Sequence, residues 1–148
     1  MTTEQSRPWV KFLPMADLPP LDNHSLAETI EGHVKAAPNA PCLEYLGVSI
    51  SYKELDQWAN QFANMLRSHG AKKGDVIGCH LPNTPQYVLA LVAASKLGCA
   101  ASGVSPLLTA PELAYQVENA GIKYLVTLDQ LYANALGPND GKLPGLTA

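Results

Sequence analysis

The sequence predicts an α/β protein in which helices flank a partial parallel sheet, with a short hairpin near the N-terminus. Short apolar segments alternate with longer segments of helical periodicity, and the connections between them are brief. Capping sequences mark the starts of the helical segments. Because parallel strands need a crossover connection, the order strand, helix, strand, helix, strand predicts a parallel sheet.

Residues 1–22 are predicted to form an extended arm, because they contain four prolines and no sustained hydrophobic period. The first helix is expected to begin at a capping box of Ser25 and Glu28 and to end before Pro38. Its apolar residues recur every three or four positions, so one side of this helix should face a core.

A hairpin is predicted next, with strands at residues 42–45 and 48–50. A second capping box, Ser51 with Glu54, begins the clearest helix of the chain, which ends at Gly70. The apolar side of this helix is expected to face the core and the polar side to face solvent. The apolar side comprises Leu55, Trp58, Ala59, Phe62 and Leu66, and the polar side comprises Asp56, Gln57, Asn60, Gln61, Asn64 and Arg67.

Three apolar segments, at residues 76–81, 99–104 and 123–128, are predicted to form the parallel sheet. The helix that connects the first two, residues 87–97, is apolar on nearly all sides. Such a helix is typical of a position buried between two layers.

Capping residues also locate the helices around this sheet. Thr84 is predicted to cap the helix after the first strand, with Pro85 in its first turn. A third capping box, Thr109 with Glu112, begins the next helix, and residues 131–136 are expected to begin one more.

The chain therefore divides into an arm at residues 1–22, an α/β unit at 23–136 and a Gly- and Pro-rich tail at 137–148. The tail is expected to be a linker or loop at a point of truncation. Three parallel strands leave a sheet edge open, and either another chain or further sequence should cover that edge.

Composition excludes some classes of partner. Charged residues make up 16% of the 148 residues, below the ~25% that is usual in soluble domains, and the formal net charge is −3. No cluster of Lys and Arg suggests a nucleic-acid partner. No secretory signal is visible and no apolar run reaches membrane-spanning length, so a cytoplasmic location is expected. Peripheral membrane association stays open, although no basic amphipathic helix supports it.

Residue types that carry chemistry are scattered along the chain. Cys42, Cys79 and Cys99 form no CxxC pair and are expected to be buried reduced thiols. Cys79 and His80 are adjacent, but adjacent residues of a strand face opposite ways, which argues against a shared metal ion. Three of the candidate carboxylates for acid–base chemistry belong to the capping boxes, and Asp75 lies in a tight polar turn. The candidates are Glu28, Glu31, Glu44, Glu54, Asp56, Asp75, Glu112, Glu118 and Asp129.

The aromatic residues Tyr45, Tyr52, Trp58 and Phe62 are expected to be core residues rather than a ligand-binding stripe. No glycine-rich phosphate loop and no nucleophile-elbow sequence is present. The sequence therefore predicts no catalytic, cofactor-binding or metal-binding residue in this chain.

Two stretches resemble core motifs of the adenylate-forming superfamily, which includes acyl-CoA synthetases, peptide-synthetase adenylation domains and luciferases. Residues 49–55 (SISYKEL) are similar to its first core motif, and residues 95–106 (SKLGCAASGVSP) are similar to its second. Between them, residues 73–77 (KGDVI) and 81–83 (LPN) resemble a segment of the same superfamily. The resemblance covers nearly the whole chain.

Two further stretches resemble bacterial long-chain fatty acid CoA ligases. Residues 105–113 (SPLLTAPEL) look like the NPLYTPREL stretch of those enzymes, with Ser105 in place of the usual Asn. Residues 7–14 (RPWVKFLP) look like their entry segment RPWLKHYP. The resemblance therefore points to the fatty acyl branch.

The resemblance implies that the chain is the N-terminal portion of an AMP-forming fatty acyl-CoA synthetase. Such an enzyme uses Mg-ATP to convert a fatty acid into an acyl-adenylate and then transfers the acyl group to CoA. The family's phosphate loop, ribose-binding Asp and catalytic Lys would lie beyond Ala148. This portion alone is therefore expected to bind neither ATP, Mg nor CoA, and to be inactive.

Two alternatives stay open. The chain could be a non-catalytic interaction or homodimerisation module derived from such a ligase, in view of its arm, its open sheet edge and its low charge content. It could also be a small flavodoxin-like domain that binds a ligand beyond the carboxyl ends of its strands. The absence of phosphate-binding sequences counts against this last alternative.

Overall fold

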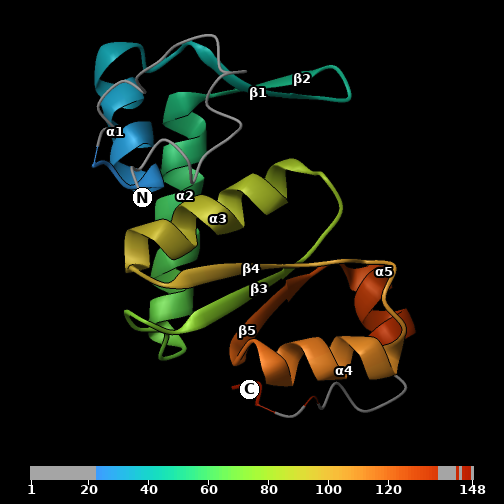
Figure 1. The fold of residues 1–148 in the computed structure, drawn as a ribbon. Helices are drawn as coiled ribbons and strands as arrows, with labels where there is room; N and C mark the ends of the chain where they lie inside the picture. The colour runs from blue at the N-terminus through green and yellow to red at the C-terminus, as the bar shows by residue number, and fades with distance from the viewer. Residues whose placement is uncertain (1–22, 137–142, 144, 148) are drawn as a thin grey trace, which may run out of the picture.

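A three-stranded parallel sheet and a two-stranded antiparallel hairpin organise the computed structural model, which describes residues 23–136, 143 and 145–147 (Figure 1). The predicted α/β class, the parallel sheet and the hairpin are confirmed. The elements are α1 (Leu26–Ala36), β1 (Pro41–Tyr45), β2 (Val48–Ser51), α2 (Tyr52–Ser68), β3 (Val76–His80), α3 (Pro85–Leu97), β4 (Ala100–Val104), α4 (Ala110–Asn119), β5 (Ile122–Thr127), α5 (Asp129–Leu131) and a π-helical segment, η3 (Tyr132–Leu136).

The parallel sheet has the order β4-β3-β5, so β3 lies in the centre and both neighbours pair with it in parallel. Helices α2 and α3 lie on one face of this sheet and α4 on the other (Figure 1). Ile77 of β3 packs with Leu66 of α2 and Ala94 of α3. On the opposite face, Leu113 of α4 packs with Ile122 of β5. The sheet is thus the middle layer of three.

A second core lies between α1, α2, α3 and the hairpin. Ile30 of α1, Leu55 of α2 and Val92 of α3 are buried there, together with Ile50 of β2. Helix α3 contributes to this core and also to the packing between the sheet and α2, which explains why its sequence is apolar on nearly all sides. The predicted burial of this helix between two layers is confirmed.

Local sequence signals set the helix ends as expected. All three predicted capping boxes form, at Ser25, Ser51 and Thr109. In the second, the Glu54 carboxylate accepts hydrogen bonds from the Ser51 backbone N–H at 2.9 Å and from the Ser51 hydroxyl at 2.6 Å. Gly98 ends α3 in the left-handed conformation, with a φ of 67°.

Gly78 in the central strand is required for a different reason, which is close packing. A Cβ atom at this position would lie 2.8 Å from the Leu125 side chain and 2.9 Å from the Ile122 side chain. A larger residue would therefore force the Leu125 and Ile122 side chains to move.

Several predictions about individual residues are wrong. Trp58 and Tyr45 are 43% and 37% exposed rather than part of the core. Asp56, expected on the solvent side of α2, is largely covered and pairs with Lys96. The first sheet strand ends at His80, one residue before the predicted end, because Leu81 leads into Pro82, which cannot donate a ladder hydrogen bond.

The cysteines are free, as predicted, but only one of them is fully buried. Cys79 is 0% exposed, whereas Cys42 and Cys99 are half-buried. Burial raises the pKa of all three thiols, so none of them is activated as a nucleophile.

The predicted arm at residues 1–22 and most of the predicted tail lie outside the described residues. Within the tail, Leu143 is buried in the core that α4 and β5 share. The Thr147 backbone N–H donates to the Lys123 carbonyl at 2.7 Å. These two residues therefore lie against the α/β unit.

The α4 core gives a first prediction. Leu113 is 0% exposed and packs with Val104, Val117 and Ile122. Replacing Leu113 with Ala should lower the free energy of unfolding by about 2–5 kcal/mol, because the cavity left behind collapses only in part. Urea unfolding followed by circular dichroism measures this change. Leu107→Ala is the matched control: Leu107 is 90% exposed, and its loss should change the value by less than ~0.5 kcal/mol. Equal destabilisation by the two variants would contradict the packing of Leu113 in this core.

Candidate functional site

The carboxyl end of the sheet is the usual ligand-binding edge of open α/β folds. His80 ends β3 and Thr127 ends β5, and their Nδ1 and Oγ1 atoms lie 3.0 Å apart. His80 is fully buried, and no described residue is a hydrogen-bond partner for its Nε2 atom. Burial lowers the pKa of His80, because an imidazolium is poorly solvated there. A neutral histidine therefore lies between the two strand ends.

A second polar atom without a described partner follows in the loop after β3. Thr84 occupies the N-cap position of α3, but its hydroxyl forms no capping hydrogen bond and its Oγ1 is buried. The predicted capping by the Thr84 side chain is therefore wrong, whereas Pro85 occupies the first turn as predicted. The Thr84 carbonyl accepts the Tyr87 N–H at 3.0 Å instead. A solute cannot contact the buried His80 Nε2 and Thr84 Oγ1 atoms without a rearrangement of the chain.

The N-termini of α1, α2 and α4 are already occupied by carboxylates of the protein. Glu28, Glu54 and Glu112 each accept hydrogen bonds from the residue that caps their helix. These hydrogen bonds lower the pKa of all three groups. An anionic phosphate would meet like charge at each of these positions.

Two features that commonly hold a nucleotide and its metal ion are absent from the described part of the chain. It contains no glycine-rich loop at a helix N-terminus. The described residues also contain no group of three or more His, Cys, Asp or Glu side chains that could hold a metal ion. The sequence analysis predicts that this chain contains no catalytic, cofactor-binding or metal-binding residue, and this remains a prediction.

Asp75, which the sequence predicts as a turn residue, is buried at the amino end of the sheet and forms an ion pair with the partly exposed Lys123. Its Oδ1 lies 2.6 Å from Lys123 Nζ, and its Oδ2 accepts the Lys72 backbone N–H at 3.0 Å. The hydrogen bond from Lys123 is the main reason why the pKa of Asp75 is lowered. This pair joins the turn before β3 to β5, at the end of the sheet opposite to His80.

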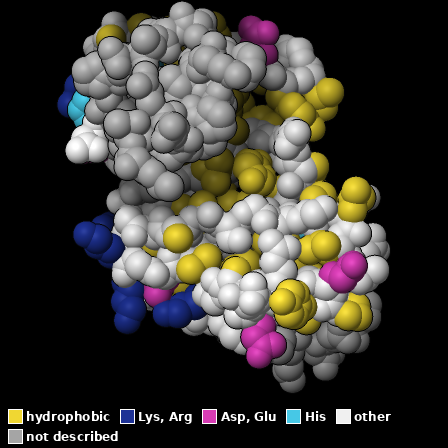
Figure 2. Space-filling model, in the orientation of Figure 1, with side chains coloured by type: hydrophobic (Ala, Val, Ile, Leu, Met, Phe, Trp, Pro, Cys, Tyr) yellow, Lys and Arg dark blue, Asp and Glu magenta, His cyan; other side chains and the backbone are white. Residues whose placement is uncertain are grey.

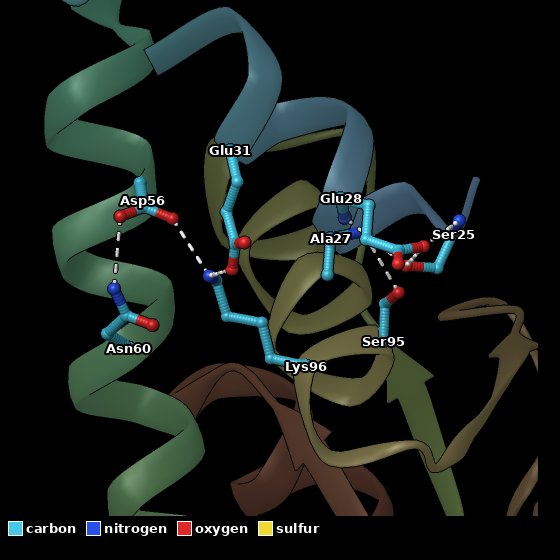
Figure 3. Close-up of polar contacts among 8 residues, drawn as sticks. All are labelled: Ser25, Ala27, Glu28, Glu31, Asp56, Asn60, Ser95 and Lys96. Carbon is cyan, nitrogen blue, oxygen red and sulfur yellow. Dashed lines mark hydrogen bonds and ion pairs between the residues drawn. The ribbon is translucent and has the colours of Figure 1, made fainter. Parts of the chain in front are cut away.

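The most extensive polar cluster joins three helices (Figure 3). Lys96 of α3 places its Nζ 2.8 Å from Glu31 Oε1 of α1 and 2.9 Å from Asp56 Oδ1 of α2. The other Asp56 oxygen accepts from Asn60 at 3.0 Å. Burial lowers the pKa of Lys96, but the two carboxylates raise it overall. The cluster is therefore an ion pair network that connects three helices.

An apolar groove lies between the hairpin and the N-terminal ends of α2 and α3. It has a volume of about 430 Å³, and we call it the hairpin groove. Figure 2 shows apolar side chains around a hollow in this part of the molecule. The sequence prediction missed the groove, because the exposure of Tyr45 and Trp58 depends on how far the hairpin stands from α3. The groove is lined by Leu43, Tyr45, Leu46, Val48, Ile50, Leu55, Trp58, Pro85, Gln86 and Leu89.

The Lys96 cluster predicts that removing the cation destabilises the protein more than removing the charge of the exposed carboxylate Glu31. Lys96→Met should lower the free energy of unfolding by about 2–3 kcal/mol, because the covered Asp56 loses its cation. Glu31→Gln should lower it by less than ~1 kcal/mol, because Glu31 is half exposed. Urea unfolding of both variants checks the order, and a larger effect of Glu31→Gln would contradict it.

The buried histidine predicts a pH dependence of stability. The pKa of His80 is lowered in the folded state, so the unfolded chain binds more protons below about pH 6.5. The contribution of neutral His80 to the free energy of unfolding is therefore constant above that pH. It decreases as the pH falls toward the pKa of His80 in the folded state. Urea unfolding of the parent and of His80→Leu at pH 7.5 and 5.5 measures the difference. The variant should lose less stability between these two pH values, and equal losses would show that His80 does not titrate differently in the folded state.

Comparison with known proteins relates these features to a family. Residues 30–146 match the model of the AMP-binding enzyme family. The chain is 28% identical to the long-chain-fatty-acid–CoA ligase of Bacillus subtilis (strain 168) over 90% of its length, which is 24% of that protein. It is 33% identical to surfactin synthase subunit 3 of the same organism over 69% of its length, or 8% of that protein. It is 35% identical to the acetyl-coenzyme A synthetase of Psychromonas ingrahamii over 55% of its length, or 12% of that protein.

Solved structures give the same result for the fold. An anthranilate CoA ligase in complex with anthranoyl-AMP superposes with a TM-score of 0.76 and 23% identity, over 89% of this chain and 25% of that one. A fatty acyl CoA synthetase of Mycobacterium tuberculosis superposes with a TM-score of 0.63 and 24% identity, over 68% of this chain and 20% of that one.

The chain thus spans about a quarter, or less, of the relatives and structures named above. The predicted resemblance to the adenylate-forming superfamily is confirmed. The alternative of a small flavodoxin-like domain is therefore rejected. The chain belongs to the family of AMP-binding, adenylate-forming enzymes.

Proposed function

We propose that this chain is the N-terminal part of an AMP-forming acyl-CoA synthetase that acts on fatty acids. The observation that carries the proposal is the match to a long-chain-fatty-acid–CoA ligase over 90% of the chain. The matches to surfactin synthase and to acetyl-coenzyme A synthetase cover 69% and 55% of it. Residues 7–14 and 105–113, which resemble the fatty acyl branch, support the same assignment.

The proposed reaction of the whole enzyme joins a fatty acid to CoA, with ATP converted to AMP and pyrophosphate. Magnesium accompanies the ATP. The residues of this chain would build the scaffold beside the reacting groups rather than supply them. Five of its carboxylates already cap helices or form ion pairs, namely Glu28, Glu54, Glu112, Asp56 and Asp75. We expect this part alone to bind neither ATP, magnesium nor CoA, and to be inactive.

A cytoplasmic location is part of the proposal. None of the helices in the described ranges is both long enough and apolar enough to cross a membrane. The described helices also include no strongly basic amphipathic one, which is the usual means of peripheral membrane attachment.

A second candidate is a non-catalytic interaction or homodimerisation module. The specific observation in its favour is the open edge of β4, where Ala100, Ala101 and Gly103 are exposed and carry no charge. Such an edge can pair with a strand of another chain. One contact already covers part of it, because Gln116 Nε2 donates to the Gly103 carbonyl at 2.9 Å.

The proposed function predicts where activity resides. We would sequence the reading frame past the codon of Ala148, express the full product, and measure pyrophosphate exchange with ATP and palmitate, octanoate, acetate or an amino acid. The full product should be most active with a fatty acid, and the 148-residue chain should show no exchange above buffer.

Other results would contradict specific parts of this proposal. Exchange that requires acetate or an amino acid would move the protein to another branch of the family. A stop codon directly after Ala148 would favour the interaction module. Pyrophosphate exchange by the 148-residue chain would show that the family's phosphate loop, ribose-binding Asp and catalytic Lys are not needed for this activity.

A further inference from the structure

The hairpin groove is apolar, and several of its side chains are open to solvent. Leu46 and Val48 are 85% and 62% exposed, and Trp58 is 43% exposed. None of the lining residues is charged, and Gln86 is the only one that carries an amide. A groove of this kind fits an apolar or aromatic segment better than a charged ligand.

A segment with matching chemistry precedes the described residues in the sequence. Residues 9–13 read Trp-Val-Lys-Phe-Leu, with four apolar side chains among five residues. Pro8 and Pro14 flank this segment and favour an extended backbone on both sides. Because proline limits the freedom of the unbound chain, docking an extended segment here costs less conformational entropy.

The connection between this segment and the groove is long enough. Helix α1 begins beside the C-terminal end of α3, where the Ala27 N–H donates to Ser95 Oγ at 3.1 Å. From Ser95 to Gln86 at the groove, α3 rises about 14 Å. The ten residues from Leu13 to Asn23 can span up to about 33 Å when extended.

We propose that the hairpin groove binds residues 9–13 of the same chain, with the Trp9 ring between the hairpin and α3. The chemistry of the segment and its reach favour this occupant over a soluble ligand. The single carboxylate of the hairpin, Glu44, lies next to the groove-lining residues Leu43 and Tyr45, where it can attract Lys11. The proposal does not depend on ligase activity, so it stands or falls separately from the proposed function.

The test uses the full 148-residue chain and the fluorescence of Trp9. The chain contains only two tryptophans, so Trp58→Phe leaves Trp9 as the single tryptophan, which can be excited selectively over the six tyrosines. The substitution also keeps an aromatic ring in the groove. If Trp9 is docked, its emission should be blue-shifted relative to the urea-unfolded chain, and acrylamide should quench it several-fold less.

Groove variants then locate the contact. Leu46→Asp with Val48→Asp, added to Trp58→Phe, places two charges at exposed groove positions without removing a buried side chain. Leu46 has a φ of 48°, a conformation that Asp adopts more readily than Leu, so the hairpin should keep its fold. This variant should restore strong quenching of Trp9. Leu107→Asp is the control, because Leu107 is 90% exposed and does not line the groove.

Three results would overturn the proposal. Trp9 that is as quenchable in the folded chain as in urea would mean that the segment is not docked. Protection that survives the two groove charges would place Trp9 elsewhere on the molecule. Protection that is lost on dilution would indicate that the groove binds the arm of a second copy. Circular dichroism and the urea midpoint of each variant confirm that the fold is retained in the comparison.

Discussion

The burial of α3 between two layers is the constraint on which the rest of the structure depends. This helix packs against α1 and α2 on one side and against the sheet on the other. Ala90, Val92, Ala93 and Ala94 are all 0% exposed, and small side chains at these positions let the neighbouring elements approach closely. Lys96, the only charged residue of α3, then holds α1 and α2 by one ion pair each. Apolar packing thus brings the layers together, and one cation sets the relative position of the three helices.

The polar groups inside the protein are explained by structure rather than by chemistry. Asp75 and Lys123 join a turn to β5, His80 and Thr127 connect two strand ends, and the capping glutamates occupy helix N-termini. These contacts use the charge or a hydrogen bond of each group within the fold, although the buried His80 Nε2 atom has no partner among the described residues. This arrangement is typical of a structural scaffold. The chain corresponds to only about a quarter of the related enzymes, so a scaffold role is consistent with its size.

The range of relatives leads to the same view. The chain is similar to ligases named for a long-chain fatty acid and for acetyl-CoA, and to a surfactin synthase subunit. Proteins with such different names share this α/β unit, so its fold alone does not indicate which carboxylic acid an enzyme of the family accepts. The branch assignment therefore depends on how much of the chain each match covers and on the assay with the full product.

Local rules of the sequence determined the elements of this protein. Capping boxes at Ser25, Ser51 and Thr109, and the helix end at Gly98, depend on contacts within a few residues, so the spacing of residue types was enough to predict them. Only the tertiary structure decided which polar and aromatic residues are covered. The periodicity of α2 assigns Asp56 and Trp58 to opposite sides but says nothing about how far α3 and the hairpin extend over them. The contact of His80 with Thr127 spans 47 residues, because strand pairing, which no local pattern contains, brings them together.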